Sequence, residues 1–365
     1  MRAAGQRRAP RRSTGAVLTA LTWVSLLAAT DRDPALTPEA TRPSPSAVAV
    51  PLPVRSSPSV QRYLIGAAGD IACDAPPASD PASSVCRYDA TAAILAGVDH
   101  VLTLGDNQYP SGALDAYLRW YEPTWGRFRT ITSPVPGNHE YLSGPGDEPT
   151  GYLAYFGDRV RGPGGLGSYS FDLPSGCTPG EGVCWHIVAI ASELCFTGGG
   201  CGPSTGTDLD AGARLYRWLE HDLATHPNAR YPCTLAFWHH PLFSFSTGSG
   251  ASSAVRPLWE LLYRARAEIV LNGHSHNYQR WDPLAPQGTP DPSRGIRQFV
   301  VGTGGARLYP LPEGPRPPAL AAAQDRAFGV LRLTLRPSGY AWTWLGIDRG
   351  TNGFSDAAPA DVACA

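Results

Sequence analysis

From residue 62 onward, short apolar segments alternate with amphipathic ones, and this alternation limits the possible fold more than any other feature of the sequence. Apolar runs bounded by Gly, Pro or polar residues are typical of buried strands, whereas apolar residues three and four apart are typical of helices. Strands are predicted at 63–68, 100–104, 131–135, 168–172, 185–190, 234–238 and 269–271. Helices are predicted at 90–96, 114–121, 208–221 and 254–264, and a hairpin at 327–335 and 340–347. Strands that alternate with helices in this way predict an α/β fold.

Clusters of polar residues come at or just after the ends of five of these strands. The clusters are Gly69-Asp70, 105–109 (GDNQY), 137–140 (GNHE), 238–241 (WHHP) and 273–276 (GHSH). In open α/β sheets, sites form at the carboxyl ends of the strands, so we expect these clusters to lie together. In four of the five a Gly comes first, and Gly permits a positive φ and the close approach of another group.

The side chains in these clusters are of the types that bind metal ions. Carboxylates, a phenol, an amide and several imidazoles together suit a hard or borderline metal such as zinc, iron or manganese. Asp106 has the chemistry to bridge two ions about 3.5–4 Å apart. Each cluster, taken alone, can also be explained by a purely structural role. Gly-Asp after a strand is often an ordinary turn, and a His pair before Pro is often a packed structural group.

Taken in order, Asp70 and the motifs GDNQY, GNHE, HHP and GHSH resemble the calcineurin-like metallophosphoesterase superfamily over about residues 62–282. The resemblance implies a four-layer α/β/β/α metallophosphoesterase sandwich, in which helices flank a central pair of sheets. The superfamily's common first motif is Asp-x-His, but here no His follows Asp70, and Tyr109 stands three residues after Asp106. That exchange is similar to the purple acid phosphatase branch. Two further segments fit the same branch, 168–172 (SYSFD) and 277–280 (NYQR).

The resemblance also implies ligands for two metal ions. By motif, the first ion is held by Asp70, Asp106, Tyr109 and His276, and the second by Asp106, Asn138, His239 and His274. A phenolate in place of a neutral imidazole adds negative charge, so we expect Fe(III) beside a divalent ion (Fe, Zn or Mn). The resembled pattern has one residue between the ligand His and Pro, which selects His239 and leaves His240 as a packed neighbour or a substrate contact. The alternative for Tyr109 is a core tyrosine with a satisfied hydroxyl.

The activity implied is that of an exported dinuclear-metal phosphatase, which hydrolyses phosphate monoesters by attack of a metal-bound hydroxide on phosphorus. His139 is expected to protonate the leaving alkoxide, or alternatively only to orient Asn138. The other possibilities are a phosphodiesterase or nucleotidase of the same superfamily, structural metals only, and a non-catalytic surface domain. The loop at 243–250 contains no His, unlike the purple acid phosphatases, so substrate breadth and an acid pH optimum stay open.

The N-terminal sixty residues differ from the rest of the chain. Residues 1–30 place five arginines before an apolar run at 16–29, which predicts a signal peptide; an uncleaved single-helix anchor is the alternative, and the only expected membrane contact. Residues 31–60 are Pro/Ser-rich and predict a disordered linker. We therefore expect a secreted or extracytoplasmic protein with its metallophosphoesterase domain at 61–356 and a tail at 357–365.

Charge and cysteine content indicate which partners and which cellular compartment to expect. The chain has 30 basic and 31 acidic residues, and five of the basic ones precede residue 31, so the remainder is acidic and nucleic acid is not expected as a partner. Eight cysteines in an exported chain suggest disulfides, although free buried thiols are the alternative. Eight cysteines allow 105 pairings, which sequence cannot decide. Closeness along the chain favours Cys73–Cys86, Cys177–Cys184 and Cys195–Cys201, leaving Cys233–Cys364.

Overall fold

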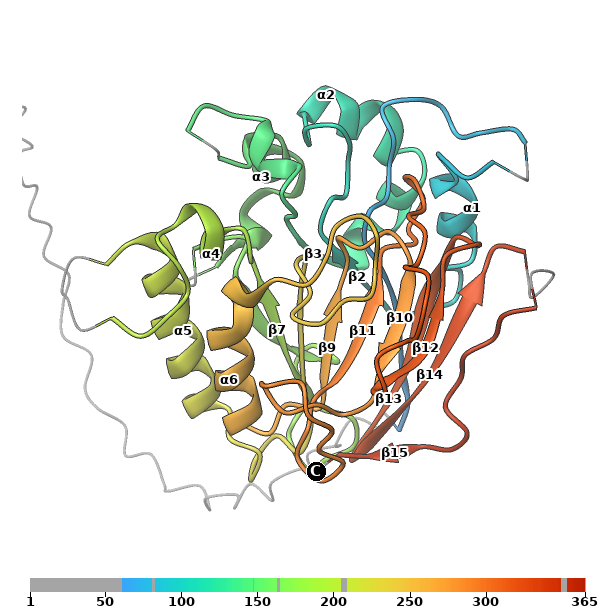
Figure 1. The fold of residues 1–365 in the computed structure, drawn as a ribbon. Coiled ribbons are helices and arrows are strands. Elements are labelled where there is room, and N and C mark those ends of the chain that lie inside the picture. The colour runs from blue at the N-terminus through green and yellow to red at the C-terminus, as the bar shows by residue number, and fades with distance from the viewer. Residues whose placement is uncertain are drawn as a thin grey trace, which may run out of the picture. The chain divides into compact units, whose positions relative to one another are not determined.

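The computed structural model describes residues 61–364, except 81–82, 147, 163–164, 205–208 and 349–352, and it contains two large β-sheets (Figure 1). The first sheet has the order β15-β14-β13-β1-β2-β3 and the second β12-β10-β11-β9-β8-β7-β6. The first comprises β1 (Tyr63–Ala68), β2 (His100–Leu104), β3 (Thr132–Val135), β13 (Gly329–Arg336), β14 (Gly339–Gly346) and β15 (Val362–Ala363). The second comprises β6 (Tyr169–Leu173), β7 (Trp185–Ile190), β8 (Thr234–Trp238), β9 (Ile269–Asn272), β10 (Tyr278–Trp281), β11 (Arg297–Val301) and β12 (Leu320–Gln324). A short pair, β4 (Arg161–Gly162) and β5 (Gly165–Leu166), lies apart from both.

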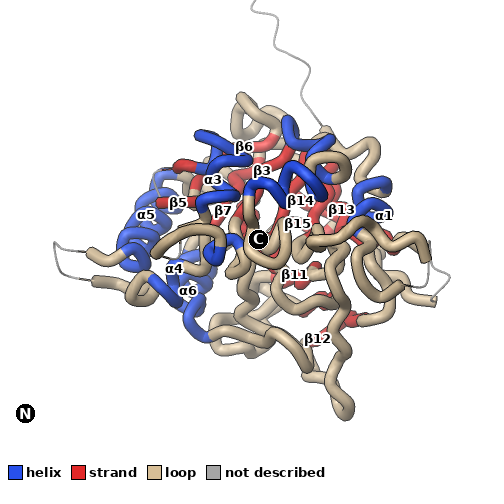
Figure 2. Tube along the Cα trace, turned by 90° about the horizontal axis from the view of Figure 1, so that it is seen from above, coloured by secondary structure: helices blue, strands red, loops and turns tan. Residues whose placement is uncertain are grey.

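Helices flank these sheets, and most are short. The α-helices are α1 (Tyr88–Ala93), α2 (Leu114–Ala116), α3 (Thr150–Phe156), α4 (Leu194–Thr197), α5 (Ala211–Thr225) and α6 (Arg256–Arg264). The other helical turns are η1 (Tyr117–Tyr121), η2 (Trp125–Ile131), η3 (Glu140–Leu142), η4 (Gly157–Val160) and η5 (Ser253–Val255). Seen from above, α4, α5 and α6 are grouped on one side and α1 lies on the other (Figure 2).

The strands of the second sheet are apolar on both faces, because each face packs against a different layer. In β8, Leu235 and Phe237 pack into the core between the sheets, whereas Ala236 and Trp238 pack against α5 and α6. Successive strand residues point to opposite faces, so a continuous apolar run is what a doubly covered strand requires. The same alternation holds in β7 and β9.

The first sheet is covered on its other face by the N-terminal helical turns. At Gly66 of β1, an added Cβ would lie 2.4 Å from Leu95 Cδ2, just after α1, so a larger residue would displace the Leu95 side chain where this layer meets the strand. Trp125 of η2 donates to the carbonyl of Tyr88 at 3.0 Å, which ties η2 to α1. Two central sheets with helices on both outer faces confirm the predicted four-layer α/β/β/α sandwich.

Most predicted strands have the bounds that the structure gives, whereas the helices differ. The helix expected at 90–96 starts earlier, as α1, and the one expected at 114–121 divides into α2 and the π-helix η1. The helix expected at 208–221 runs as α5 instead, because Asp210 Oδ1 accepts a hydrogen bond from Ala213 N at 2.8 Å and caps it there. Sequence alone does not show which of several neighbouring Asp residues will cap a helix.

The C-terminal strands form the expected hairpin, and disulfides fix the ends of several loops. β13 pairs with β14 in antiparallel register, and β15 pairs with β14 at the edge of the sheet. The segment 357–365, which was predicted to be a separate tail, therefore pairs with the first sheet through β15. The three disulfides favoured by closeness and the remaining pair Cys233–Cys364 are all present, so all eight cysteines are paired.

The predicted signal peptide at 1–30 and linker at 31–60 lie outside the described residues. Among the residues that the structure describes, no helix has both the length and the apolar character to cross a membrane.

Candidate metal centre

Five loops converge where parallel strands end. β1, β2 and β3 are parallel neighbours in the first sheet, as are β8 and β9 in the second. The loops after these strands carry the predicted site residues Asp70, Asp106, Tyr109, Asn138, His139, His239, His274 and His276. Hydrogen bonding between His239 Nδ1 and the carbonyl of Leu104, 2.8 Å apart, joins the two sheets at this point. The structure thus brings donors from more than two hundred residues of chain to one place.

One half of the centre surrounds the hydroxyl of Tyr109. Tyr109 Oη lies 2.9 Å from Asp70 Oδ1, 2.8 Å from Asp106 Oδ2 and 2.9 Å from His276 Nε2. His276 Nε2 is also 3.1 Å from Asp70 Oδ1. These four side chains are the set expected for the first ion.

The other half of the centre shares Asp106 with the first. His239 Nε2 lies 3.3 Å from Asp106 Oδ2 and 3.2 Å from His274 Nδ1. Asn138 Oδ1 is buried and has no hydrogen-bond partner among the described residues. A buried amide oxygen without a partner is costly unless something positive reaches it, so its state fits a cation ligand.

Backbone amides hold the two aspartates in place. Asp106 Oδ1 accepts from His139 N at 2.9 Å, and Asp70 Oδ2 accepts from His274 N at 2.8 Å. In each case one carboxylate oxygen is fixed by the backbone of another motif and the other oxygen faces the remaining donors. Asp70, Asp106 and His274 all have positive φ, at 60°, 47° and 68°, and such backbone is found mainly where surrounding structure enforces it.

The glycines that precede the clusters provide space as well as conformational freedom. Gly105 has a φ of +83°, and a Cβ there would lie 2.6 Å from His239 Nδ1. A Cβ at Gly273 would lie 2.7 Å from Asp70 Oδ2. Both glycines are therefore required for the two sheets to approach closely at the centre.

Glu140, the last residue of GNHE, holds the loops of the centre together, a role that the sequence analysis did not assign to it. Its carboxylate accepts from Asp106 N at 3.0 Å, Asn107 N at 2.8 Å, Gly137 N at 2.7 Å and Tyr117 Oη at 3.0 Å. Burial, with a contribution from the Asp106 charge, raises the pKa of Glu140 to about 8. A buried acid directly after a ligand motif is the signal that could have identified it.

The charges at the centre favour a cation. Burial, reinforced by Asp106 and Asp70, raises the pKa of Tyr109 well above its usual range, so its hydroxyl stays protonated unless positive charge is supplied. Burial would lower the pKa of His239, but Asp106 outweighs it and raises that pKa to about 10. Burial also opposes ionisation of Asp106, but the charge of His239 holds its pKa below the ordinary range. The donors present thus fit bound metal ions.

The two histidines expected to be non-ligands lie beside this set. His139 contacts the ring of Tyr109, with centroids 4.4 Å apart, and its Nε2 is 3.9 Å from Asp106 Oδ2. His240 Nδ1 lies 2.9 Å from Ser192 Oγ, and its Nε2 is 3.5 Å from Glu193 Oε2. The ring of His240 also packs against His239 and His274, with centroids 5.0 and 4.5 Å apart. It therefore adjoins the ligand set and could itself join a metal-holding group with these two, whereas His239 also reaches Asp106.

Comparisons with known proteins agree with this fold and site. The calcineurin-like phosphoesterase family matches residues 64–278, which is more than half of the chain. Purple acid phosphatase 22 of Arabidopsis thaliana is 26% identical over 247 residues, which cover 63% of this chain and 51% of the plant protein. The chain belongs to the calcineurin-like phosphoesterase family, and its similarity within that family is to the purple acid phosphatase branch. It spans about half the length of the curated relatives it matches.

Solved structures with the same fold include an enzyme and a protein described as an anchor. Purple acid phosphatase PPD1 from yellow lupin (Lupinus luteus) seeds has a TM-score of 0.57 at 18% identity, over 83% of this chain and 54% of the lupin chain. GAP50, described as the anchor in the inner membrane complex of Plasmodium, has a TM-score of 0.54 at 10% identity, over 84% of this chain and 90% of its own. At these identities the likeness concerns the fold alone.

Proposed function

We propose that this chain is an exported, dinuclear-metal phosphatase that hydrolyses phosphate monoesters. The observation that carries the proposal is the position of Asp106 Oδ2, 2.8 Å from Tyr109 Oη and 3.3 Å from His239 Nε2. One carboxylate oxygen shared by two groups of donors is what two neighbouring cations need. Membership of the calcineurin-like phosphoesterase family supports a phosphate-ester hydrolase.

In this proposal Asp70, Asp106, Tyr109 and His276 hold one ion, and Asp106, Asn138, His239 and His274 hold the other. The unpartnered oxygen of Asn138 and the crowding of two carboxylates around a phenol support this division. A phenolate ligand favours Fe(III) on the Tyr109 side, with Fe, Zn or Mn as the divalent partner. When bound, the two ions would supply charge for the phosphate oxygens and acidify a water molecule.

His139 is placed to deliver the proton that the leaving alcohol needs. Its Nδ1 is hydrogen-bonded to the carbonyl of Pro110, so Nδ1 carries the hydrogen and Nε2 is the nitrogen that exchanges a proton. The side chain is 31% exposed, which lets a substrate approach Nε2 from the solvent side. Proton delivery by a positioned His contributes about 10²- to 10⁴-fold to such reactions.

Export is supported by the cysteines, since all eight are paired and paired cysteines are typical of oxidising compartments. The signal peptide at 1–30, the linker at 31–60 and the domain limits 61–356 belong to this proposal. A phosphodiesterase of the same family is the alternative activity. GAP50, which has the same fold, is described as an anchor, so a non-catalytic surface domain is a further alternative. In this chain every expected ligand position holds a donor, which supports the enzyme.

The test is metal analysis and hydrolysis assays on one purified preparation. We expect two metal ions per chain, a visible absorption band from tyrosinate bound to Fe(III), and faster hydrolysis of p-nitrophenyl phosphate than of its bis-ester. Preference for the bis-ester would replace the monoesterase with a diesterase. Two bound zinc or manganese ions without the band would remove the iron assignment only, and a metal-loaded protein without activity on either ester would contradict the proposed function.

A further inference from the structure

A cavity of about 400 Å³ opens directly beside the candidate metal centre. Tyr109, His139 and His276 form one of its sides, so a phosphate held at the centre would have its ester oxygen facing this space. Cavities of about 300–1,000 Å³ are the usual size for small-molecule sites. The volume suffices for a ring-sized group but not for a large oligomeric substrate.

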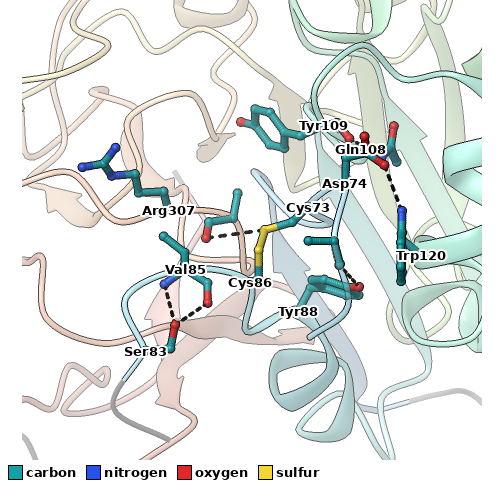
Figure 3. The surroundings of a disulfide bond; sticks show 12 residues. Cys73, Asp74, Ser83, Val85, Cys86, Tyr88, Gln108, Tyr109, Trp120 and Arg307 are labelled. Atoms are coloured by element: carbon teal, nitrogen blue, oxygen red, sulfur yellow. Dashed lines mark hydrogen bonds between the residues drawn. A yellow bond between two sulfur atoms is a disulfide. The ribbon is translucent and has the colours of Figure 1, made fainter. Parts of the chain in front are cut away.

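Apolar residues also line the cavity, and the set of Val85, the Cys73–Cys86 disulfide, Pro110 and Ala306 is called the apolar wall here. Figure 3 shows the disulfide and Val85 on the side facing Tyr109. Val85 is 39% exposed and lines the cavity, so it leaves apolar surface there for a ligand to cover. The side chains of the wall can therefore bury an apolar part of a ligand rather than form hydrogen bonds with it.

Asp74 and Arg307 also line the cavity, and they do not suit a ligand that carries several negative charges. The carboxylate of Asp74 accepts a hydrogen bond from Trp120 Nε1 at 3.0 Å (Figure 3). Arg307 is exposed, and it is the one arginine among the lining residues that the structure describes. Away from the metal centre, a nucleoside polyphosphate or an inositol polyphosphate would bring several negative charges to one arginine and a carboxylate, so such leaving groups are disfavoured.

The apolar wall is fixed relative to the metal centre by backbone hydrogen bonds. Cys86 N donates to Ala306 O at 2.8 Å, and Val85 forms an antiparallel bridge with Arg307. The carbonyl of Arg307 in turn bonds His276 Nδ1. One continuous chain of contacts therefore joins Val85 to a proposed metal ligand, so the distance from the phosphate to the wall is set by the fold.

We propose that this cavity binds the leaving group of the ester and selects phosphate monoesters of apolar, ring-containing alcohols. The inference rests on the proposed phosphatase function and adds its substrate class. Burying one ring against the wall is expected to favour such an ester by roughly 10- to 100-fold in kcat/KM over an ester with a one- or two-carbon alcohol.

The test compares benzyl phosphate with ethyl phosphate, because their alcohols have similar acidity and differ mainly in the ring. The wild-type enzyme should prefer benzyl phosphate by about 10-fold or more. Val85→Asp should lower the ratio of the two kcat/KM values by about 10-fold, because a charge replaces apolar surface. Leu118→Asp serves as the matched control: Leu118 is 55% exposed on η1, outside the cavity, and its replacement should leave the ratio unchanged.

A second measurement uses inhibitors that cannot be hydrolysed. Phenylphosphonate should inhibit at least about 10-fold more tightly than methylphosphonate, and Val85→Asp should remove most of that difference. Arg307→Gln should weaken both inhibitors by the same factor, because it changes general attraction of anions. Equal hydrolysis of both esters, or an unchanged ratio in Val85→Asp, would overturn the leaving-group site while the phosphatase stands. No hydrolysis of either ester by metal-loaded enzyme would overturn both.

Discussion

Tyr109 Oη is the atom on which the metal assignment most depends. A hydroxyl has one proton, yet two carboxylate oxygens and an imidazole nitrogen all lie within 2.9 Å of it. It cannot donate to Asp70 and Asp106 at once, so without a cation one of these contacts is unfavourable. A bound ion would convert the same geometry into shared coordination.

Tyr109→Phe tests this residue with the smallest change, since only the oxygen is removed. We expect loss of the visible absorption band, loss of iron, and a fall in kcat by more than the roughly 10- to 100-fold typical of residues that merely support a ligand. Tyr63→Phe, on β1 far from the centre, is the control and should behave as wild type. If the Tyr109→Phe variant kept the band and the activity, Tyr109 would be a core tyrosine and not a metal ligand.

Glu140 acts on the site through the backbone. It stabilises the loops of Asp106 and Gly137 by accepting hydrogen bonds from their amides. Glu140→Gln replaces one acceptor oxygen by an amide NH2, which is itself a donor and would face other donors. We expect a loss of about 2–3 kcal/mol in the free energy of unfolding, together with weaker metal binding.

Urea unfolding and metal titration of Glu140→Gln are the measurements, with Glu148→Gln as the exposed control expected within about 0.5 kcal/mol of wild type. If Glu140→Gln unfolded and bound metal as wild type does, the loops would not depend on this carboxylate.

At the scale of elements, a histidine between two aspartates joins β6, β7 and α5 at the end of the second sheet remote from the metal centre. His186 Nδ1 lies 3.2 Å from Asp172 Oδ1, and its Nε2 lies 2.8 Å from Asp222 Oδ2. His226 stacks on His186 with centroids 3.9 Å apart. Both ring nitrogens of His186 face acceptors, so this arrangement is satisfied when His186 is protonated.

The pH dependence of this contact follows from its pKa shifts. Burial lowers the pKa of His186, but hydrogen bonds to Asp172 and Asp222 outweigh it and raise that pKa above its usual value. Its stabilising effect is therefore complete below about pH 6.5 and is lost as the pH rises through the folded-state pKa. Burial raises the pKa of the two aspartates, but the bonds to His186 outweigh it, so their effect is present above about pH 3.8.

His186→Asn should therefore cost more stability at pH 5.5 than at pH 8.5, by about 1–2 kcal/mol in the difference between variant and wild type. Urea unfolding at both pH values, with disulfides intact, measures this. His221→Asn, an exposed histidine on α5, should show the same small effect at both. A cost independent of pH would mean that His186 is neutral in the folded protein.

At the scale of the whole molecule, the Cys233–Cys364 disulfide closes the longest loop, with a sequence separation of 131. It attaches the segment that carries β15 to the start of β8. A crosslink over such a loop restricts the unfolded chain far more than one over a short loop does.

Replacing both Cys233 and Cys364 by Ser should lower the free energy of unfolding by about 5 kcal/mol on the chain-entropy estimate. The matched double variant of Cys177 and Cys184, whose separation is 7, should lose only about 2 kcal/mol. Denaturant unfolding of both variants measures the difference. Equal losses would show that unfolded-state entropy does not govern these crosslinks.

The sequence predicted the sheets and the donor set because both depend on local signals. Apolar runs such as 185–190 and 234–238 match β7 and β8, and strand-end motifs show which residues meet. The role of Glu140 and the start of α5 at Asp210 could not be predicted, because each depends on which donor the folded chain brings within reach. Nor could the apolar wall, since Val85 and Arg307 become neighbours only after folding.

The amide clamps on Asp70 and Asp106 have a consequence for how such a protein can change over evolutionary time. Each clamp uses a main-chain N–H, of His274 or His139, which every residue other than proline retains. The imidazoles can therefore be replaced while the fold persists. Replacing either aspartate would remove a hydrogen bond that holds two loops together. In related chains that no longer bind metal ions, we expect the histidines to be replaced first and the two aspartates last.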